Sequence, residues 1–211
     1  QNRVVKLATD DPIETDFQII EEGRPYRQFY MKEYAGVDYD TGKPLWYLNE
    51  SGDETTGDYN AAAKRYVGSA DPKVLGGFGT SVNWKGLDFN IDFTYRLGGK
   101  VYNYGAPFTG YGMSLMSPLR EVAVDSWTED NKGAKHPQYI PGDPYNATKD
   151  SSRFLYSGNY LKIGNITLGY TLPAKWTKKA FIQKLRVYVS LDNVYTVMAD
   201  DFVGYTPETF T

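Results

Sequence analysis

Residues 87–97 alternate without interruption between apolar and polar side chains. The apolar positions are Leu87, Phe89, Ile91, Phe93, Tyr95 and Leu97, and the polar ones are Asp88, Asn90, Asp92, Thr94 and Arg96. A period of two places the two sets on opposite sides, so this run predicts a β-strand with one apolar and one polar face. Such a strand is roughly 36 Å long, or about 26 Å high when tilted near 45°. That height matches the apolar band of an outer-membrane barrel, about 25 Å, whereas most strands of soluble domains have about five or six residues.

The composition narrows the class of protein. No run of about 18 apolar residues occurs, which excludes a transmembrane helix, although hydropathy averages do not detect alternating barrel strands. The net charge of −3 gives no indication of a basic surface that would bind nucleic acid. The absence of cysteine excludes disulfides and thiol chemistry. The chain contains 19 tyrosines. Tyrosine gathers where an apolar and an aqueous phase meet, but tyrosine-rich β-proteins of other kinds are also common.

Other segments repeat the two-faced pattern. Residues 78–84, 166–172 and 185–193 alternate in the same way, and the pair Lys85-Gly86 predicts a tight hairpin turn into 87–97. Residues 2–9 are a plausible first strand. A second hairpin is predicted from residues 28–39 and 45–49 around the turn at 40–44. A short charged stretch, 174–183, is expected to hold a helical turn.

Residues 100–152 differ from the rest, because Gly, Pro, Asn and Asp dominate them. Helical spacing occurs only at 117–128, with Ser117 as the expected cap and Pro118 at the first helical position. A connection of about fifty residues is too long for a hairpin turn, so it should carry function or wrap a surface. Its aromatic side chains suit oligosaccharides or peptides, or alternatively pack the loop onto itself. The candidates for ligand contact are Tyr102, Tyr104, Tyr111, Trp127, Tyr139 and Tyr145.

The sequence predicts no catalytic, cofactor or metal site. Residues 38–42 (Asp-x-Asp-x-Gly) lack the other ligands of a calcium loop, and a hairpin turn explains them. Gly76-Gly77-Phe78-Gly79 is not followed by a helix, as a phosphate site would require. His136 is the single histidine; no G-x-S-x-G motif accompanies it, and we interpret it as an exposed loop residue. Asp88 and Asp92 lie roughly 13 Å apart along their strand, beyond the separation of a glycosidase pair.

Residues 152–173, SRFLYSGNYLKIGNITLGYTLP, resemble the barrel region of SusC/RagA-like TonB-dependent transporters, which are Bacteroidetes outer-membrane proteins. Further similar stretches occur in the family's order at residues 34–38, 41–46, 98–103, 185–196 and 204–208, the last with Thr206 where the family has Asp. The resemblance implies an all-β fold of antiparallel up-and-down strands, a segment of a 22-stranded transmembrane β-barrel. The plug, the TonB-contacting segment and the terminal strand are missing. We therefore expect residues 1–211 to be a late barrel portion of seven to nine strands.

The resemblance also implies a function. The whole protein is expected to import oligosaccharides, or less often peptides, across a Gram-negative outer membrane, with TonB acting through the missing N-terminal part and a SusD-like surface lipoprotein as partner. Residues 100–152 would form a long, partly helical extracellular loop, and Lys85-Gly86 a periplasmic turn. The apolar face of 87–97 would contact outer-membrane lipid. The residues expected to face the lumen or plug are Asp88, Asn90, Asp92 and Arg96.

The position of Lys162 allows two interpretations. Extending the apolar face of 166–172 backwards puts Lys162 on it and Leu161 and Ile163 on the polar face. Either a bulge at Gly164-Asn165 inverts the alternation, or Lys162 lies at the rim and extends into water.

The alternative to the barrel is a soluble β-sandwich that binds glycans as an adhesin or lectin module. In a sandwich the apolar strand faces would meet in a dry core between two sheets.

Overall fold

The computed structural model describes residues 2–9, 11–109, 111, 118–204 and 206–210. The chain forms two compact units. Unit 1 comprises Gln1–Asp71, Gly99–Ser157 and Val203–Thr211, and unit 2 comprises Pro72–Gly98 and Gly158–Phe202. No described helix is long and apolar enough to cross a bilayer.

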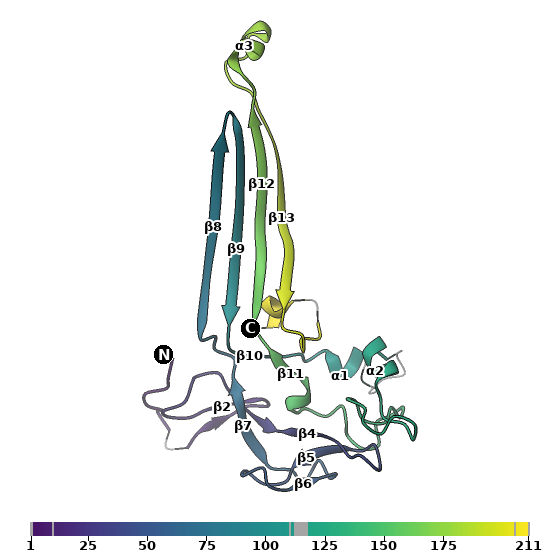
Figure 1. Cartoon of the computed structure of the whole chain (residues 1–211). Helices are drawn as coiled ribbons and strands as arrows, with labels where there is room; N and C mark the ends of the chain where they lie inside the picture. The colour runs from purple at the N-terminus through teal and green to yellow at the C-terminus, as the bar shows by residue number, and fades with distance from the viewer. Residues whose placement is uncertain (1, 10, 110, 112–117, 205, 211) are drawn as a thin grey trace. The chain divides into compact units, whose positions relative to one another are not determined.

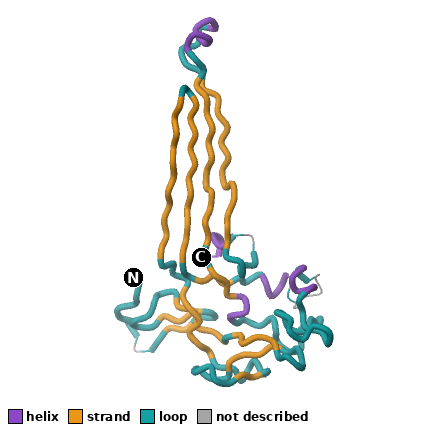
Figure 2. Tube along the Cα trace, in the orientation of Figure 1, coloured by secondary structure: helices purple, strands orange, loops and turns teal. Residues whose placement is uncertain are grey.

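Unit 2 is built on one antiparallel sheet of four long strands, in the order β13-β12-β9-β8 (Figure 1). The strands are β8 (Val74–Trp84), β9 (Leu87–Leu97), β12 (Tyr160–Thr171) and β13 (Arg186–Met198). Lys85 and Gly86 join β8 to β9 with φ values of 47° and 91°, the left-handed pair that a two-residue hairpin needs. The short helix α3 (Ala174–Thr177) and the 3-10 turn η2 (Lys178–Ala180) connect β12 to β13 (Figure 2). The four strands and the helical turn predicted for this unit are confirmed.

The register of the sheet separates apolar from polar side chains. Phe89 of β9 lies opposite Val82 of β8 and Leu168 of β12. Ile166 and Leu168 in turn lie opposite Leu191 and Val189 of β13. Since paired residues share a face, all four strands contribute to one apolar face and one polar face.

A β-bulge resolves the question of Lys162. The register of β12 shifts between Ile163 and Asn165 against both neighbouring strands. Leu161 and Ile163 therefore pair with Tyr95 and Phe93 on the apolar face, whereas Lys162 pairs with Thr94 on the polar face. The first of the two interpretations is confirmed: the extra residue inverts the alternation, so Lys162 does not face the apolar side.

Unit 1 contains short strands and short helical turns. Its larger sheet has the order β1-β2-β3-β7, with β1 (Ile13–Glu14), β2 (Gln18–Ile20), β3 (Gln28–Lys32) and β7 (Lys64–Ser69). A second sheet contains β4 (Tyr34–Val37), β5 (Pro44–Tyr47) and β6 (Thr55–Thr56), and a third pairs β10 (Lys100–Tyr102) with β11 (Leu155–Ser157). The helical turns are α1 (Ala106–Thr109), α2 (Arg120–Val124), η1 (Ser152–Phe154) and η3 (Pro207–Phe210). The hairpin predicted around residues 40–44 is confirmed as β4 and β5.

One hydrophobic core joins distant parts of unit 1. It contains Phe29, Met31, Val67, Ala70, Tyr102, Ala106, Tyr111, Val122, Phe154 and Leu155. Phe17 stacks on Tyr102 with ring centroids 4.4 Å apart, and Tyr111 meets the edge of Phe154 at 5.3 Å. The segment before residue 72 and the segment after residue 98 therefore fold as one body, because each supplies part of the same core.

Three sequence predictions for unit 1 are corrected. Residues 2–9 form no strand: Val4 exchanges two backbone hydrogen bonds with Gly23 and Arg24, but its neighbours add no ladder. The helix expected at 117–128 is limited to Arg120–Val124, with Leu119 at the cap position, and Ser117 lies outside the described residues. The described residues contain thirteen strands, of which four are long, in place of seven to nine barrel strands; residues 1–71 contribute short strands that pack into a core.

Candidate functional site

Unit 2 leaves its apolar face exposed. Trp84 is 65% exposed, Phe78 57% and Val189 64%, although each pairs with apolar neighbours along the sheet. Among the described residues of unit 2, no second sheet covers this face. A soluble sandwich requires these side chains in a dry core, so the structure disfavours the adhesin alternative.

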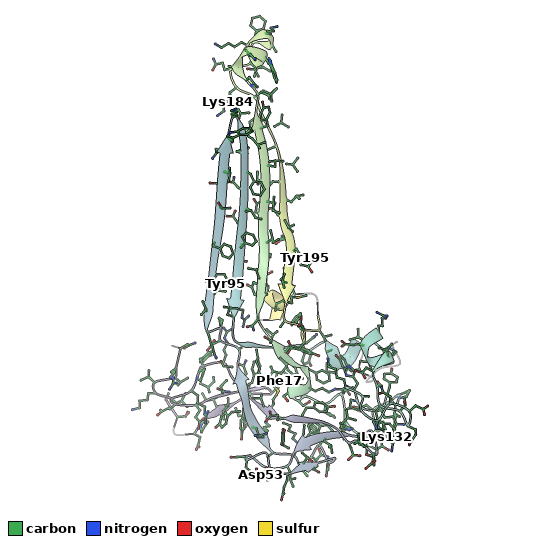
Figure 3. The ribbon with its side chains drawn as sticks, viewed as in Figure 1. Phe17, Asp53, Tyr95, Lys132, Lys184 and Tyr195 are labelled. Atoms are coloured by element: carbon green, nitrogen blue, oxygen red, sulfur yellow. The ribbon has the colours of Figure 1, made fainter. Side chains whose placement is uncertain are left out.

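Tryptophan and tyrosine rings mark two levels of the apolar face. The register places Trp84 and Tyr170 near the Lys85-Gly86 turn. Tyr95 and Tyr195, which Figure 3 labels, lie toward the opposite end of the sheet. Tyr95 pairs with Gly76, eight positions from Trp84, which separates the two levels by about 26 Å along the strand. Rings at both ends of an apolar band are typical of the aromatic girdles of membrane barrels.

The polar face carries a hydrogen-bond network. The Asn165 amide donates to Asp192 Oδ1 at 2.7 Å and to Ser190 Oγ at 2.9 Å, and Thr167 donates to Asn165 Oδ1 at 2.9 Å. A shallow hollow of about 440 Å³ lies beside it, lined by Ser81, Asn90, Asp92 and Asn165 among others. The register places Asp88, Asn90, Asp92 and Arg96 together on this face. That the face borders a lumen or a plug stays a prediction.

An ion pair crosses the middle strand of this face. Arg186 of β13 donates to both carboxylate oxygens of Asp88 of β9, at 3.0 and 2.5 Å. Gly169 of β12 pairs with Asp88 and lies between them. A Cβ atom at position 169 would lie 2.5 Å from Arg186 Nη2 and from Asp88 Oδ2. The missing side chain therefore lets the two ends of the ion pair meet across a third strand.

The six aromatic candidates of the long connection separate into two groups. Tyr102, Tyr111 and Trp127 are buried, so their rings fill the core of unit 1 instead of presenting a free face. Tyr104 is exposed, and Tyr139 and Tyr145 are half-buried. Lys43 lies 4.8 Å from the centre of the Tyr145 ring. The rings of the first group pack, as in the alternative interpretation, but they also contact residues before position 72, so they do not pack the loop only onto itself.

Trp127 joins the long connection to the first part of unit 1. Its indole Nε1 donates to the carbonyl of Tyr39 at 2.8 Å. A Cβ atom on Gly42 would lie 2.4 Å from the Trp127 ring, and Gly42 has a φ of 68°. The turn at 38–43 thus requires glycine for both its backbone and its contact with Trp127. This explains residues 38–42 without a metal ion, and the described residues contain no group of three metal-ligating side chains.

A small cavity of about 210 Å³ in unit 1 contains an arginine without a carboxylate hydrogen-bond partner among the described residues. Its lining includes Tyr34, Tyr111, His136, Arg153 and Tyr156. Arg153 Nη1 donates to the carbonyl of Ala147 at 2.5 Å, and its guanidinium carbon lies 5.0 Å from the Tyr111 ring centre. Aromatic faces thus stabilise its charge, together with the electrostatic attraction of Asp143.

Two polar atoms at this cavity, the Tyr34 hydroxyl and His136 Nε2, have no hydrogen-bond partner in the part of the chain that the structure describes. Burial raises the pKa of Tyr34 to about 12. Burial, together with the charge of Arg153, lowers the pKa of His136 below its usual value, so the imidazole is neutral at pH 7. His136 is 6% exposed, which corrects the prediction of an exposed loop residue. The cavity combines a fixed cation with hydroxyl groups, which suits water or a small anion.

The sequence alone does not reveal this cavity, because its lining comes from five separate parts of the chain. Arg153 served only as part of the family resemblance, and Tyr34 lies more than a hundred residues away from it. No periodicity connects such positions.

The comparisons with known proteins bear on the whole chain. No family model matches it. It is 27% identical over 229 residues to "TonB-dependent receptor P3" of Formosa agariphila, a match that covers 99% of this chain and 22% of that protein. "TonB-dependent receptor P39" of the same organism is 24% identical, with 99% and 24% covered. The chain thus spans about a quarter or less of the length of these relatives.

Solved structures are similar to this chain over nearly its whole length. The "RagAB peptide importer in the 'open-open' state" matches with a TM-score of 0.80 and 32% identity, over 98% of this chain and 22% of that one. Its "closed-closed" state gives the same score and identity. The chain is related to the TonB-dependent receptors. The predicted fold, an antiparallel section of such a transporter barrel, is confirmed; within this chain the section is an open sheet with β8 and β13 at its edges.

Proposed function

We propose that this section belongs to an outer-membrane nutrient importer driven through TonB, a transporter and not an enzyme. The observation that carries the proposal is the uncovered apolar face of unit 2, with aromatic rings at both of its ends, in a chain related to TonB-dependent receptors. A face of this kind needs lipid in place of water. Its surroundings would then be the outer membrane of a Gram-negative bacterium.

The chain order supports an orientation. At one end of the sheet the connections are the two residues Lys85-Gly86 and the short segment 172–185. At the other end, β9 continues into residues 99–157 and β8 follows residues 1–71. Outer-membrane barrels have short periplasmic turns and long extracellular loops. We therefore place unit 1, including the connection 100–152, on the extracellular side, where it meets substrate.

The proposed substrates are oligosaccharides or peptides. The peptide option is supported by solved relatives that are named peptide importers. The oligosaccharide option is supported by Tyr104, Tyr139 and Tyr145, whose rings are not fully buried and suit stacking on sugars. A SusD-like lipoprotein is the proposed surface partner. Asp88, Asn90, Asp92 and Arg96 would face the lumen or the plug.

Fractionation and uptake by intact cells test the proposal. We expect the full-length protein in the outer-membrane fraction, and we expect its deletion to abolish growth on either a defined peptide mixture or a defined oligosaccharide mixture, but not on the free monomers. Loss of TonB should reproduce the defect. Recovery of the full-length protein in the soluble fraction would refute membrane insertion and restore the adhesin alternative.

A further inference from the structure

The connection between β12 and β13 is strongly basic. It carries Lys175, Lys178, Lys179 and Lys184, and the sequence has no acidic residue between Asp150 and Asp192. Arg186, at the start of β13, is neutralised by Asp88. None of the four lysines forms an ion pair with another described residue. Figure 3 labels Lys184 at this end of the sheet.

Exposed apolar side chains, two of them aromatic, accompany these lysines. Phe181 is 97% exposed, and Trp176 and Ile182 are also exposed. Phe181 has a φ of 59°, in the left-handed region that bulky residues rarely adopt. Exposing a large apolar ring to water is unfavourable. The connection therefore combines cationic side chains with exposed apolar side chains.

Trp176 also borders an apolar groove on the sheet. The groove has a volume of about 460 Å³, and its lining includes Leu168 and Tyr170 of β12 and Val187 and Val189 of β13. These side chains belong to the apolar face that the proposed function places in lipid. The groove therefore continues that face up to Leu172 and Trp176 of the connection.

The neighbouring hairpin adds charge at the same end. Thr171, the last residue of β12, donates its backbone N–H to the carbonyl of Gly86 at 2.7 Å, which places the two connections side by side. Lys85 precedes Gly86, and its amino group lies 4.9 Å from the ring centre of Trp84. A fifth lysine thus lies beside a second tryptophan of the apolar face.

We propose that residues 172–185 form a binding site for an anionic phospholipid of the leaflet at this end of the barrel. The lysines bind the phosphate of the headgroup, and the groove beside Trp176 takes an acyl chain. Both parts of such a lipid are matched: the charge of the headgroup by the lysines of the connection, and the acyl chain by the apolar groove that Trp176 of the same connection borders. The inference rests on the proposed function, because it needs the sheet to be in a bilayer.

Lipid selectivity of the full-length protein tests the site. The protein is reconstituted into bilayers of phosphatidylcholine with trace spin-labelled phosphatidylglycerol or spin-labelled phosphatidylcholine, and electron spin resonance measures the fraction of each label held at the protein surface. Each lysine close to an anionic headgroup contributes a factor of about five to its affinity. We expect wild type to prefer phosphatidylglycerol, and the variant K175Q/K178Q/K179Q/K184Q to lose most of that preference.

Two control variants separate the site from charge and folding in general. K175R/K178R/K179R/K184R keeps the charge and should keep the preference. K6Q/K100Q/K132Q/K149Q removes the same number of lysines from unit 1 and should leave the preference unchanged. Equal binding of the two lipids by wild type, or an equal loss in both Gln variants, would overturn the inference. Failure of wild type to insert into the bilayers would instead refute the proposed function, so the two failures can be told apart.

Discussion

Aromatic side chains occur in both units, but in unit 1 many are buried in a core, whereas in unit 2 they lie on an exposed face. In unit 1, Phe154 and Tyr111 are buried against each other, and Tyr102 of the long connection is buried in the same core. In unit 2, Phe78 and Phe93 also stack, with centroids 4.8 Å apart, yet Phe78 is exposed. Unit 1 therefore carries its own apolar interior, whereas unit 2 needs an apolar surrounding. The difference shows that a chain's aromatic content says little until each ring is assigned to a core or to a surface.

The strongest test of this contrast is a matched pair of Phe→Ala substitutions. Phe154→Ala removes a ring that is 0% exposed and should cost about 3–5 kcal/mol of unfolding free energy. Phe78→Ala removes a ring from the exposed face and should cost far less when the full-length protein is in a bilayer, since lipid fills the space. Urea unfolding of both variants in bilayers measures the difference. Equal costs would contradict the assignment of the two rings to different surroundings.

A charge on the exposed face tests its surroundings directly. Val189→Arg puts a guanidinium on the apolar face of β13 and should cost about 2–4 kcal/mol in a bilayer if it lies near the midplane. Val5→Arg, at a position of unit 1 that is 90% exposed, is the matched control and should cost almost nothing. The measurement is the folded fraction in urea for each variant. A Val189→Arg variant as stable as the control would mean that water covers this face.

The sequence was sufficient for unit 2 and insufficient for unit 1, and the reason is physical. The side chains of 87–97 have a period of two that needs no distant information, so strand, faces and hairpin turn could all be predicted. The sequence leaves the bulge at Gly164 as one of two options, because a run that places Lys162 among apolar residues is inconsistent with an unbroken strand. Unit 1 depends on contacts between residues far apart, such as Phe17 with Tyr102, and no local pattern encodes them. The Arg153 cavity was missed for the same reason, and so was the need for a glycine at position 169.

The ion pair across β12 provides a smaller test within unit 2. Gly169→Ala introduces a Cβ atom that displaces the Asp88 and Arg186 side chains, and should lower the free energy of unfolding by less than Val189→Arg does, because an exposed ion pair contributes little. In an Asp88→Asn background the same substitution should cost less, because the ion pair is already lost. A double-mutant cycle from urea unfolding in bilayers measures the coupling. Strict additivity would show that the ion pair does not depend on the missing side chain.

The smallest expected effect concerns the pH dependence of unit 1. His136 has a folded-state pKa below its usual value of about 6.5 because it is buried near Arg153, so the unfolded chain takes up its proton first as the pH falls. Its contribution to stability is therefore complete above about pH 6.5 and declines as the pH falls below that value, at no more than about 1.4 kcal/mol per pH unit. His136→Phe should remove this decline, whereas Phe78→Ala in unit 2 should leave it unchanged. Thermal unfolding of the full-length protein between pH 5 and 8 measures both. A decline that survives in His136→Phe would assign the pH dependence to groups other than this imidazole.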